Sequence, residues 1–350
     1  MAHKILHKNI HLPARIKKML VVKPSSLGDV VHSLPFLNVI KSYFFNSEIH
    51  WVIAKGIEGL LEGHPMIDKL WIIGKDDWKK LSNVKRTISE IRNLWKDLKK
   101  EKFDFVIDLQ GLLRSGLITV ATGSRVRVGF GEAREGSKLF YTHRVKTARD
   151  IHAVERNLKV AEFLGCDTSP VFFPFPLYYP NPSIMSALPD NYGVFAPGAR
   201  WETKKWPAER FGRLASLLTV PVVIIGNKSD KVIAEEIVNS AKGEALSLAG
   251  ETSLKELMEV IKRARFVVSN DSGPMHIAAA LGIPVFAIFG PTDPVRTGPY
   301  GKGHTVIRAD VSCSPCLKKT CEDLKCMRSI SAERVCEAMS LRLSSYLPVQ

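Results

Sequence analysis

The sequence predicts an α/β fold built from two βαβ domains, and three observations support this. Short apolar runs rich in β-branched residues recur, each followed by a polar turn and a helical pattern, as in buried parallel sheets. A proline-rich stretch at 170–182 interrupts this alternation, which then starts again. The length of 350 residues suits two domains. We therefore expect a basic extension at 1–17, a first domain at 18–175, a linker at 176–190 and a second domain at 191–350, with a cleft between the domains.

The first domain should contain five strands and two helices before the linker. We expect the strands at 19–23, 50–54, 69–73, 105–108 and 125–128. One helix is expected at 30–43 and a longer one at 75–102, in which apolar residues three and four apart form one stripe. Acidic residues are interspersed among the basic ones of the longer helix, which favours a solvated face over a membrane surface. A basic loop is expected at 129–150.

The second domain repeats the pattern. We expect strands at 192–196, 222–225, 266–268 and 285–289. Ser253 and Glu256 have the spacing of a capping box, so a helix should begin there and run to Arg263.

The stretch at 265–290 predicts a strand, a tight polar turn, a short helix and a second strand. Turn and N-cap residues at 270–273 end the first strand, and Pro274 follows at a position where a helix tolerates a missing N–H group. Gly282 should end the helix. The free N–H groups at such a helix start favour an anion, above all a diphosphate. A βαβ packing unit with a capped helix explains the same pattern equally well.

The turn at 24–29 follows the first strand in the same way. Gly28 permits close backbone approach, and the carboxylate of Asp29 is favoured by the dipole of the helix that begins there. From the residues alone, Asp29 is either an N-cap or a catalytic base.

The charge of the chain limits the function classes. Fifty Lys and Arg residues against 35 Asp and Glu give a net charge of +15, which attracts nucleic acid, anionic membrane or phosphorylated substrates. No nucleic-acid-binding motif is present, and a solvated basic surface is the alternative. The sequence has neither an apolar run of membrane-spanning length nor the apolar core of a secretory signal, so we expect a cytoplasmic protein.

Five of the six cysteines lie near the C-terminus. The spacing of Cys313, Cys316, Cys321 and Cys326 could suit a metal ion, although the pattern holds only one Cys-x-x-Cys pair. Reduced thiols in a cytosolic protein are the other interpretation, and it is the one that we favour.

Three motifs together resemble the ADP-heptose:lipopolysaccharide heptosyltransferases. They are Val-Val-Lys-Pro-Ser-Ser-Leu-Gly-Asp-Val-Val-His-Ser-Leu-Pro (21–35), Val-Ile-Asp-Leu-Gln-Gly-Leu-Leu-Arg-Ser (106–115), and Ser-Asn-Asp-Ser-Gly-Pro-Met-His (269–276) with Phe-Gly-Pro-Thr-Asp (289–293). The Asp-Leu-Gln-Gly motif and Glu-Ala-Arg-Glu at 132–135 are most similar to heptosyltransferase I, which adds the first heptose to Kdo. The cysteine-bearing tail is more similar to heptosyltransferase II, so the acceptor stays open.

The resemblance implies a GT-B fold, in which two Rossmann-like domains face each other across a central cleft, and an inverting transfer that needs no metal. It implies that Asp29 is the general base and that Lys204 contacts the donor phosphates, helped by Thr203. It also implies donor contacts from Asp271, Ser272, Gly273 and His276, with Asp271 near the heptose hydroxyls. For the acceptor it suggests Ser26, Gly28, Gln110 and Arg134.

The partners implied by the resemblance are ADP-heptose and Kdo-lipid A at the cytoplasmic face of the inner membrane, with no nucleic acid. Two other function classes are kept as alternatives. One is a sugar-nucleotide-binding protein without transfer activity, and the other is a nucleic-acid-binding protein, which only the net charge suggests.

Overall fold

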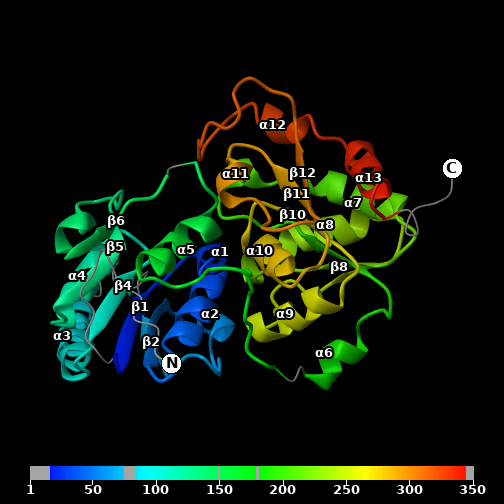
Figure 1. Ribbon diagram of the computed structural model, residues 1–350. Helices are drawn as coiled ribbons and strands as arrows, with labels where there is room; N and C mark the ends of the chain where they lie inside the picture. Colours follow the sequence, from blue (N-terminus) through cyan, green and yellow to red (C-terminus); the bar gives the residue numbers. More distant parts are fainter. Residues whose placement is uncertain (1–15, 75–83, 149, 179–180, 344–350) are drawn as a thin grey trace. The chain divides into compact units, whose positions relative to one another are not determined.

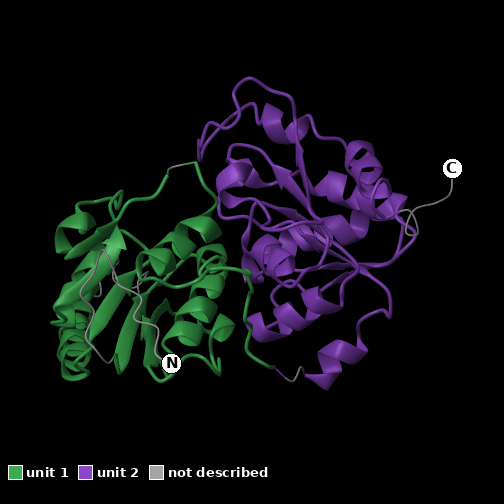
Figure 2. Ribbon diagram, viewed as in Figure 1, with its two compact units in different colours: residues 1–177 green, residues 178–350 purple. Residues whose placement is uncertain are grey.

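The computed structural model describes residues 16–74, 84–148, 150–178 and 181–343 (Figure 1). The chain divides into two compact units, residues 1–177 and 178–350 (Figure 2). Each unit contains a six-stranded sheet in which all strands are parallel, with helices between successive strands. The predicted α/β fold with two βαβ domains is therefore confirmed. Most of the expected extension at 1–17 and the first part of the helix expected at 75–102 lie outside the described residues.

The sheet of the first unit has the order β3-β2-β1-β4-β5-β6. Its strands are β1 Lys18–Val22, β2 Glu48–Ala54, β3 Lys69–Ile73, β4 Phe105–Asp108, β5 Val126–Phe130 and β6 His143–Val145. β2 and β3 are added in turn on one side of β1, and β4, β5 and β6 are then added in turn on its other side. The switch point between β1 and β4 is where such sheets bind ligands. The expectation of a loop at 129–150 is wrong in part, because β6 lies inside it and pairs with β5.

The helices of the first unit are α1 Leu27–Val31, α2 Leu34–Tyr43, α3 Val84–Lys100, α4 Leu113–Ala121 and α5 Ala153–Phe163, with short 3₁₀ turns η1 Glu58–Leu60 and η4 Ser137–Phe140. The single helix expected at 30–43 is in fact two helices. Pro35 lies in the first turn of α2. Because proline has no N–H and its ring clashes with the carbonyl four residues earlier, α1 cannot continue through it.

The second unit repeats this arrangement with the order β12-β11-β10-β7-β8-β9. Its strands are β7 Gly193–Ala196, β8 Val222–Ile224, β9 Ala245–Ser247, β10 Val267–Asn270, β11 Val285–Phe289 and β12 Thr305–Arg308. The switch point of this sheet lies between β7 and β10, whose following loops therefore start side by side.

The helices of the second unit are α6 Pro182–Ser186, η5 Glu202–Lys204, α7 Ala208–Leu217, η6 Lys228–Asp230, α8 Lys231–Ser240, α9 Leu254–Arg263, α10 Gly273–Ala280, α11 Pro294–Thr297, α12 Lys325–Arg328 and α13 Ala332–Ser340. α6 lies within the segment expected as a linker. The predicted capping box is confirmed, because the Ser253 N–H donates to the Glu256 carboxylate and the Glu256 N–H donates to the Ser253 hydroxyl. Gly282 follows α10 with φ +76°, the left-handed conformation expected of a residue that ends a helix.

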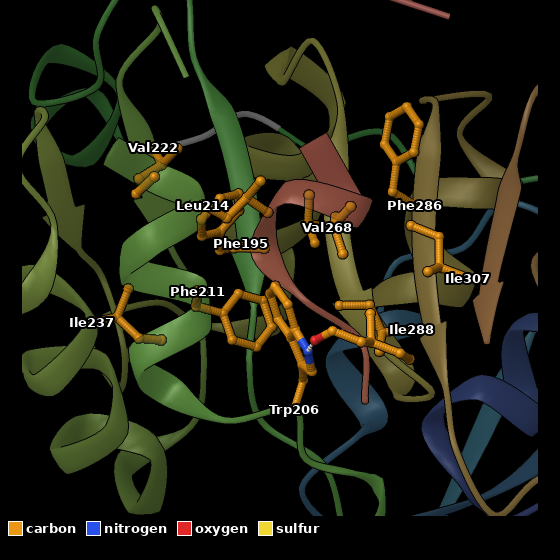
Figure 3. Close-up of a cluster of buried hydrophobic side chains, with 14 of the residues drawn as sticks. Phe195, Trp206, Phe211, Leu214, Val222, Ile237, Val268, Phe286, Ile288 and Ile307 are labelled. Carbon is orange, nitrogen blue, oxygen red and sulfur yellow. Dashed lines mark hydrogen bonds between the residues drawn. The ribbon is translucent and has the colours of Figure 1, made fainter. Parts of the chain in front are cut away.

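A large apolar core holds the second unit together (Figure 3). Phe195 on β7 and Phe211 on α7 are fully buried in it, with ring centroids 5.6 Å apart. Trp206 lies in the same core, and its indole N–H donates to the carbonyl oxygen of Ile330 at 2.9 Å. Trp206 follows directly on the loop after β7, so the core fixes that end of the loop.

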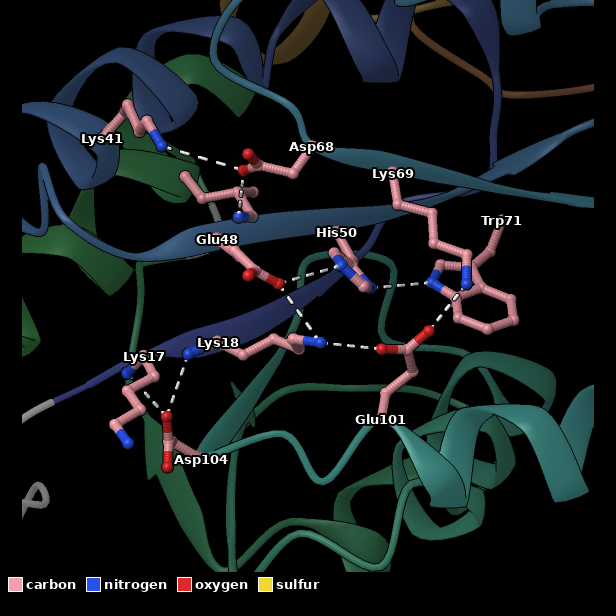
Figure 4. A network of polar contacts seen from close by, with 11 residues as sticks. Lys17, Lys18, Lys41, Glu48, His50, Asp68, Lys69, Trp71, Glu101 and Asp104 are labelled. Carbon is pink, nitrogen blue, oxygen red and sulfur yellow. Dashed lines mark hydrogen bonds and ion pairs between the residues drawn. The ribbon is translucent and has the colours of Figure 1, made fainter.

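An ion-pair network lies on the first unit, at the opposite end of the sheet from the switch-point loops (Figure 4). The carboxylate of Glu101 contacts Lys18 Nζ at 2.8 Å and Lys69 Nζ at 2.6 Å. Lys18 also lies 3.2 Å from Glu48. The hydrogen bonds from Lys18 and then Lys69 lower the pKa of Glu101 to about 2. The network joins β1, β2 and β3 to the residue after α3.

This pKa shift predicts acid sensitivity. The unfolded chain takes up a proton at Glu101 near its ordinary value of 4.5, whereas the folded protein does so only near 2. Stability from this group is therefore present above pH 4.5 and is lost as the pH falls towards 2. Glu101→Gln should remove on the order of 1 kcal/mol at pH 7. It should also flatten the fall in the free energy of unfolding on acidification, measured by urea denaturation. Glu235→Gln, an exposed site on α8, is the control, and an equal acid slope in the wild type and Glu101→Gln would contradict the prediction.

Candidate functional site

In the first unit, one group of candidate site residues lies at the β1–β4 switch point. α1 begins at Leu27 with Ser26 as its N-cap, so Asp29 is in the first turn and is not the N-cap itself. The carboxylate Oδ2 of Asp29 accepts hydrogen bonds from the backbone N–H and the hydroxyl of Ser26, both at 2.7 Å. Its Oδ1 lies 3.8 Å from Lys23 Nζ. These contacts fix the carboxylate and complement its negative charge.

Asp29 remains open to solvent despite these contacts. Its side chain is 44% exposed, whereas that of Lys23 is 8% exposed. The Asp29 carboxylate can therefore contact a ligand, whereas the ammonium group of Lys23 is shielded from solvent. A fixed, accessible acceptor of protons is the arrangement that a general base requires.

Lys23 is a site residue that our reading of the sequence missed. Burial lowers the pKa of Lys23, against the nearby carboxylates of Asp29 and Asp108, which raise it. Its ammonium group donates to the carbonyl oxygen of Leu109 at 2.9 Å, so it ties the loop after β1 to the loop after β4. A lysine directly after a buried apolar strand was the signal that could have identified it.

Asp108 at the end of β4 shapes the second loop. It is fully buried, and burial raises the pKa of its carboxyl group. Oδ2 accepts a hydrogen bond from the Tyr141 hydroxyl at 2.6 Å, and Oδ1 accepts from the N–H groups of Gln110 and Gly111 at 2.8 and 3.0 Å. Asp108 therefore holds the backbone at 110–111 in place.

This loop brings the acceptor candidates of the first unit together. Gln110 Oε1 accepts from the N–H of Ser25 at 3.3 Å, which places Gln110 beside the turn that carries Ser26, Gly28 and Asp29. The N–H of Arg134 donates to the carbonyl of Gly111 at 2.9 Å. Gly28 is a buried residue of α1. Because glycine has no side chain, it can contribute only backbone atoms. Ser26, Gly28 and Gln110 thus lie at the β1–β4 switch point, and the backbone of Arg134, in the loop after β5, is bonded to the same loop as Gln110.

In the second unit, another group of candidate site residues lies at the β7–β10 switch point. Lys204 ends η5 and Asp271 directly follows β10, and their Nζ and Oδ2 atoms are 2.6 Å apart. Both side chains are largely buried, with exposures of 17% and 8%. The ammonium group also lies 4.7 Å from the ring centroid of Trp201. Two residues 67 positions apart therefore form a buried ion pair at the carboxyl edge of the sheet.

α10 begins next to this ion pair. Ser272 is its N-cap, but the side chain makes no capping hydrogen bond, and Oγ lies 3.2 Å from Ser269 Oγ. The first N–H groups of a helix have no partner inside the helix, so those of Gly273 and Met275 can serve an anion, whereas Pro274 between them has no N–H. His276 is buried in the second turn. The predicted donor residues at 271–276 are thus all at one helix start.

Two further residues hold the loops at this switch point. Asn270, which our sequence analysis did not single out, is fully buried; its Oδ1 accepts from the N–H of Trp206 at 3.1 Å and its Nδ2 donates to the carbonyl of Pro197 at 2.6 Å. Thr203 is 2% exposed and its hydroxyl donates to the carbonyl of Lys318 at 2.9 Å. Thr203 therefore anchors η5 to the segment that carries the cysteines.

The cysteine segment at 313–326 packs against the same part of the second unit. The N–H groups of Cys316 and Leu317 donate to the carbonyl of Pro291 at 3.1 and 2.8 Å. Burial raises the pKa of Cys326, and the nearby Cys313, Cys316 and Cys321 raise it further. Among the described residues, no three His, Cys, Asp or Glu side chains are arranged to hold a metal ion, and the four cysteines are free thiols.

Comparison with known proteins identifies the family. Residues 91–327 match the profile of Glycosyltransferase family 9 (heptosyltransferase). The chain belongs to glycosyltransferase family 9. This heptosyltransferase is 32% identical over 329 residues to lipopolysaccharide heptosyltransferase 1 of Pseudomonas aeruginosa, and the aligned region covers 87% of each chain. It is 28% identical over 346 residues to lipooligosaccharide heptosyltransferase 2 of Campylobacter jejuni, across 94% of this chain and all of the relative.

The fold of this heptosyltransferase is shared with solved structures. The structure of E. coli heptosyltransferase WaaC with ADP matches it with a TM-score of 0.76 and 27% identity, over 93% of this chain and 99% of the other. Together with the two parallel six-stranded sheets, this likeness confirms the predicted GT-B fold. In the described part of the chain, no helix is long and apolar enough to cross a membrane.

Proposed function

We propose that this heptosyltransferase transfers heptose from ADP-heptose to the Kdo residue of the lipopolysaccharide inner core, without a metal ion and with inversion at the anomeric carbon. Relatives named heptosyltransferase 1 support the first heptose addition, since the P. aeruginosa protein is 32% identical. The WaaC structure with ADP supports an adenosine diphosphate leaving group. We place the reaction at the cytoplasmic face of the inner membrane, where a lipid-anchored acceptor is reached.

The proposed base is Asp29, and its geometry is the observation that carries the proposal. An acceptor hydroxyl becomes a good nucleophile only when its proton is removed. Asp29 Oδ2 is held by two donors of Ser26, so the carboxylate needs no reorientation before it accepts that proton. The hydroxyl oxygen then attacks the anomeric carbon from the side opposite the ADP, and the bond to the diphosphate breaks.

The second unit supplies groups for the departing ADP. Negative charge develops on the diphosphate as its bond to the sugar breaks. Lys204 and the N–H groups at the start of α10 stabilise that charge. Asp271 Oδ2 is 2.6 Å from the Lys204 ammonium nitrogen. We propose that the diphosphate takes over this lysine, while Asp271 accepts hydrogen bonds from heptose hydroxyls. His276 and Thr203 support the same half-site, Thr203 by holding η5.

The acceptor half-site is proposed to use Gln110 and Arg134 beside Ser26. An arginine complements the phosphate and carboxylate groups of a Kdo-lipid A acceptor. If this charge pairing is used, the acceptor KM rises with salt concentration because added ions screen exposed charges.

One experiment tests both the activity and the acceptor. ADP release should be measured with ADP-heptose against Kdo-lipid A and against heptosyl-Kdo-lipid A in parallel. We expect release with Kdo-lipid A at a kcat/KM at least about 10-fold higher than with the heptosylated acceptor, the discrimination that a few lost contacts produce. Preference for the heptosylated acceptor would instead assign the second heptose addition. If the protein binds ADP-heptose but releases no ADP with either acceptor, heptose transfer is refuted and the protein is a sugar-nucleotide-binding protein.

A further inference from the structure

An apolar groove runs between α3 and α4 on the first unit. The two helices are neighbours on one side of the sheet (Figure 1). The groove has a volume of about 340 Å³. Its walls are formed by Thr87, Ile91, Leu94, Trp95, Leu113, Arg114, Leu117, Ile118 and Glu135. Six of these nine residues are apolar, so the groove is suited to hydrocarbon and not to a sugar or nucleotide.

Apolar side chains continue from the groove onto the surface. On α3, Ile88 and Trp95 belong to the predicted apolar stripe and are 53% and 39% exposed. On α4, Leu113, Leu117 and Val120 are exposed at positions four and three apart, which lie on one face of a helix. We call these five residues with the groove the α3–α4 face. A contiguous exposed apolar surface of this kind marks an interaction site.

The charges of α3 are arranged on one side of its exposed apolar edge. Arg92 is four residues after Ile88 and Lys99 is four residues after Trp95, so these two cations lie next to the exposed apolar side chains. Lys96 is four residues after Arg92 and three before Lys99, on the same side of the helix. None of the three cations has a carboxylate partner among the described residues. The two acidic residues of α3 are already paired, Glu90 with Arg86 at 2.8 Å and Asp97 with Lys100 at 3.1 Å. Unpaired positive charge therefore borders the apolar surface.

We infer that the α3–α4 face binds the surface of an anionic lipid bilayer. Exposed aliphatic side chains and Trp95 enter the boundary between headgroups and acyl chains, where tryptophan is favoured. Arg92, Lys96 and Lys99 reach anionic headgroups with their long side chains, each adding a favourable electrostatic contribution that salt weakens. The interspersed acidic residues do not oppose this, because internal pairing on α3 has already neutralised them.

The face is connected to the candidate acceptor site. The N–H of Leu113 donates to the Glu135 carboxylate at 3.1 Å, and Glu135 both lines the groove and follows Arg134. Since α3 and α4 both run from the carboxyl edge of the sheet, one end of the groove lies at the edge that carries Gln110. A bilayer on this face would present a lipid-anchored acceptor next to that edge. The inference rests on the proposed function for its purpose, but membrane binding can be tested without any substrate.

Vesicle flotation tests the inference on the full-length protein. We expect binding to vesicles of phosphatidylethanolamine with phosphatidylglycerol, weak binding to phosphatidylcholine vesicles, and a decrease with added salt. Trp95→Ser with Leu117→Ser should lower the partition coefficient by about 10-fold or more, because two apolar contacts with the acyl region are lost. Arg92→Glu with Lys96→Glu should lower it to a similar extent, and only for the anionic vesicles.

Matched variants at exposed sites outside the face serve as controls. Phe45→Ser and Leu341→Ser remove exposed apolar side chains, and Lys242→Glu reverses an exposed charge; all three should bind vesicles as the wild type does. Brominated acyl chains should quench tryptophan fluorescence, and Trp95→Phe, which preserves the apolar surface, should bind normally with less quenching. This second measurement does not depend on how well the double variants fold.

Three results would overturn the inference. One is unchanged partition of the double variants, and another is equal quenching of the wild type and Trp95→Phe. The third is binding only when the acceptor glycolipid is present in the vesicles, which would assign the groove to an acyl chain of the acceptor. Failure of heptose transfer with normal vesicle binding would refute the proposed function alone, so the two failures are distinguishable.

Discussion

Asp29→Asn is expected to lower the rate of heptose transfer by about 10²-fold or more while the affinity for ADP-heptose stays nearly unchanged. Asparagine has the shape of aspartate and can keep a hydrogen bond to Ser26, but it cannot take a proton from the acceptor. Lys23 then loses the carboxylate 3.8 Å away, although its hydrogen bond to Leu109 remains. Single-turnover transfer rates and calorimetric titration with ADP-heptose separate chemistry from donor binding.

The control for this variant is Asp68→Asn. The Asp68 carboxylate pairs with Lys41 Nζ at 3.8 Å and does not belong to the switch-point loops. Its transfer rate should match that of the wild type. Thermal unfolding of both variants shows whether any loss comes from stability, since Asp29 also holds the first turn of α1. Full turnover by Asp29→Asn would remove this residue from the role of base, and the transfer would then need another proton acceptor.

Lys204→Ala is expected to weaken ADP binding by about 10- to 100-fold, because a charge-assisted contact to the diphosphate is lost. A second effect has the same direction. Without the ammonium group, the buried Asp271 carboxylate has lost its partner at 2.6 Å and its charge repels the diphosphate. Calorimetric titration with ADP measures the combined loss.

The neighbouring Lys205 provides a matched control for this prediction. Its ammonium group pairs with the exposed Glu202 at 2.6 Å, so Lys205→Ala should leave ADP affinity within about twofold of the wild type. The double variant Lys204→Ala with Asp271→Asn removes the buried unpaired charge and should recover stability lost in the single variant, but not ADP affinity. Unchanged ADP affinity in Lys204→Ala would place the phosphate site elsewhere.

Local signals in the sequence were sufficient for nine of the strands. These strands are read from short apolar runs, because a strand covered on both faces excludes polar residues. The short edge strands β6, β9 and β12 were not expected. The start of α9 follows from Ser253 and Glu256, and the end of α10 from Gly282, since caps are formed by residues within a few positions. The break between α1 and α2 was also encoded locally in Pro35, but the apolar pattern at 30–43 hid it.

Contacts between distant residues were not readable from the sequence. Asp108 and Tyr141 are 33 residues apart in the chain. They meet because β5 pairs in parallel with both β4 and β6, which brings the segment before β6 close to the end of β4. Asn270 joins two loops by hydrogen bonds to residues 64 and 73 positions away. Neither pairing leaves a spacing or a periodicity in the chain.

The sequence by itself determined that this protein alternates strands and helices in two halves, and that Asp29, Lys204 and Asp271 follow strands at sheet edges. Such information is local, because hydrophobic periodicity and capping act over a few residues. Only the tertiary structure decided that Lys204 and Asp271 form one buried ion pair, that Lys23 lies beneath Asp29, and that Trp95 is exposed beside a groove. Burial and pairing depend on which loops the strand order brings together, and that order is a property of the folded sheet.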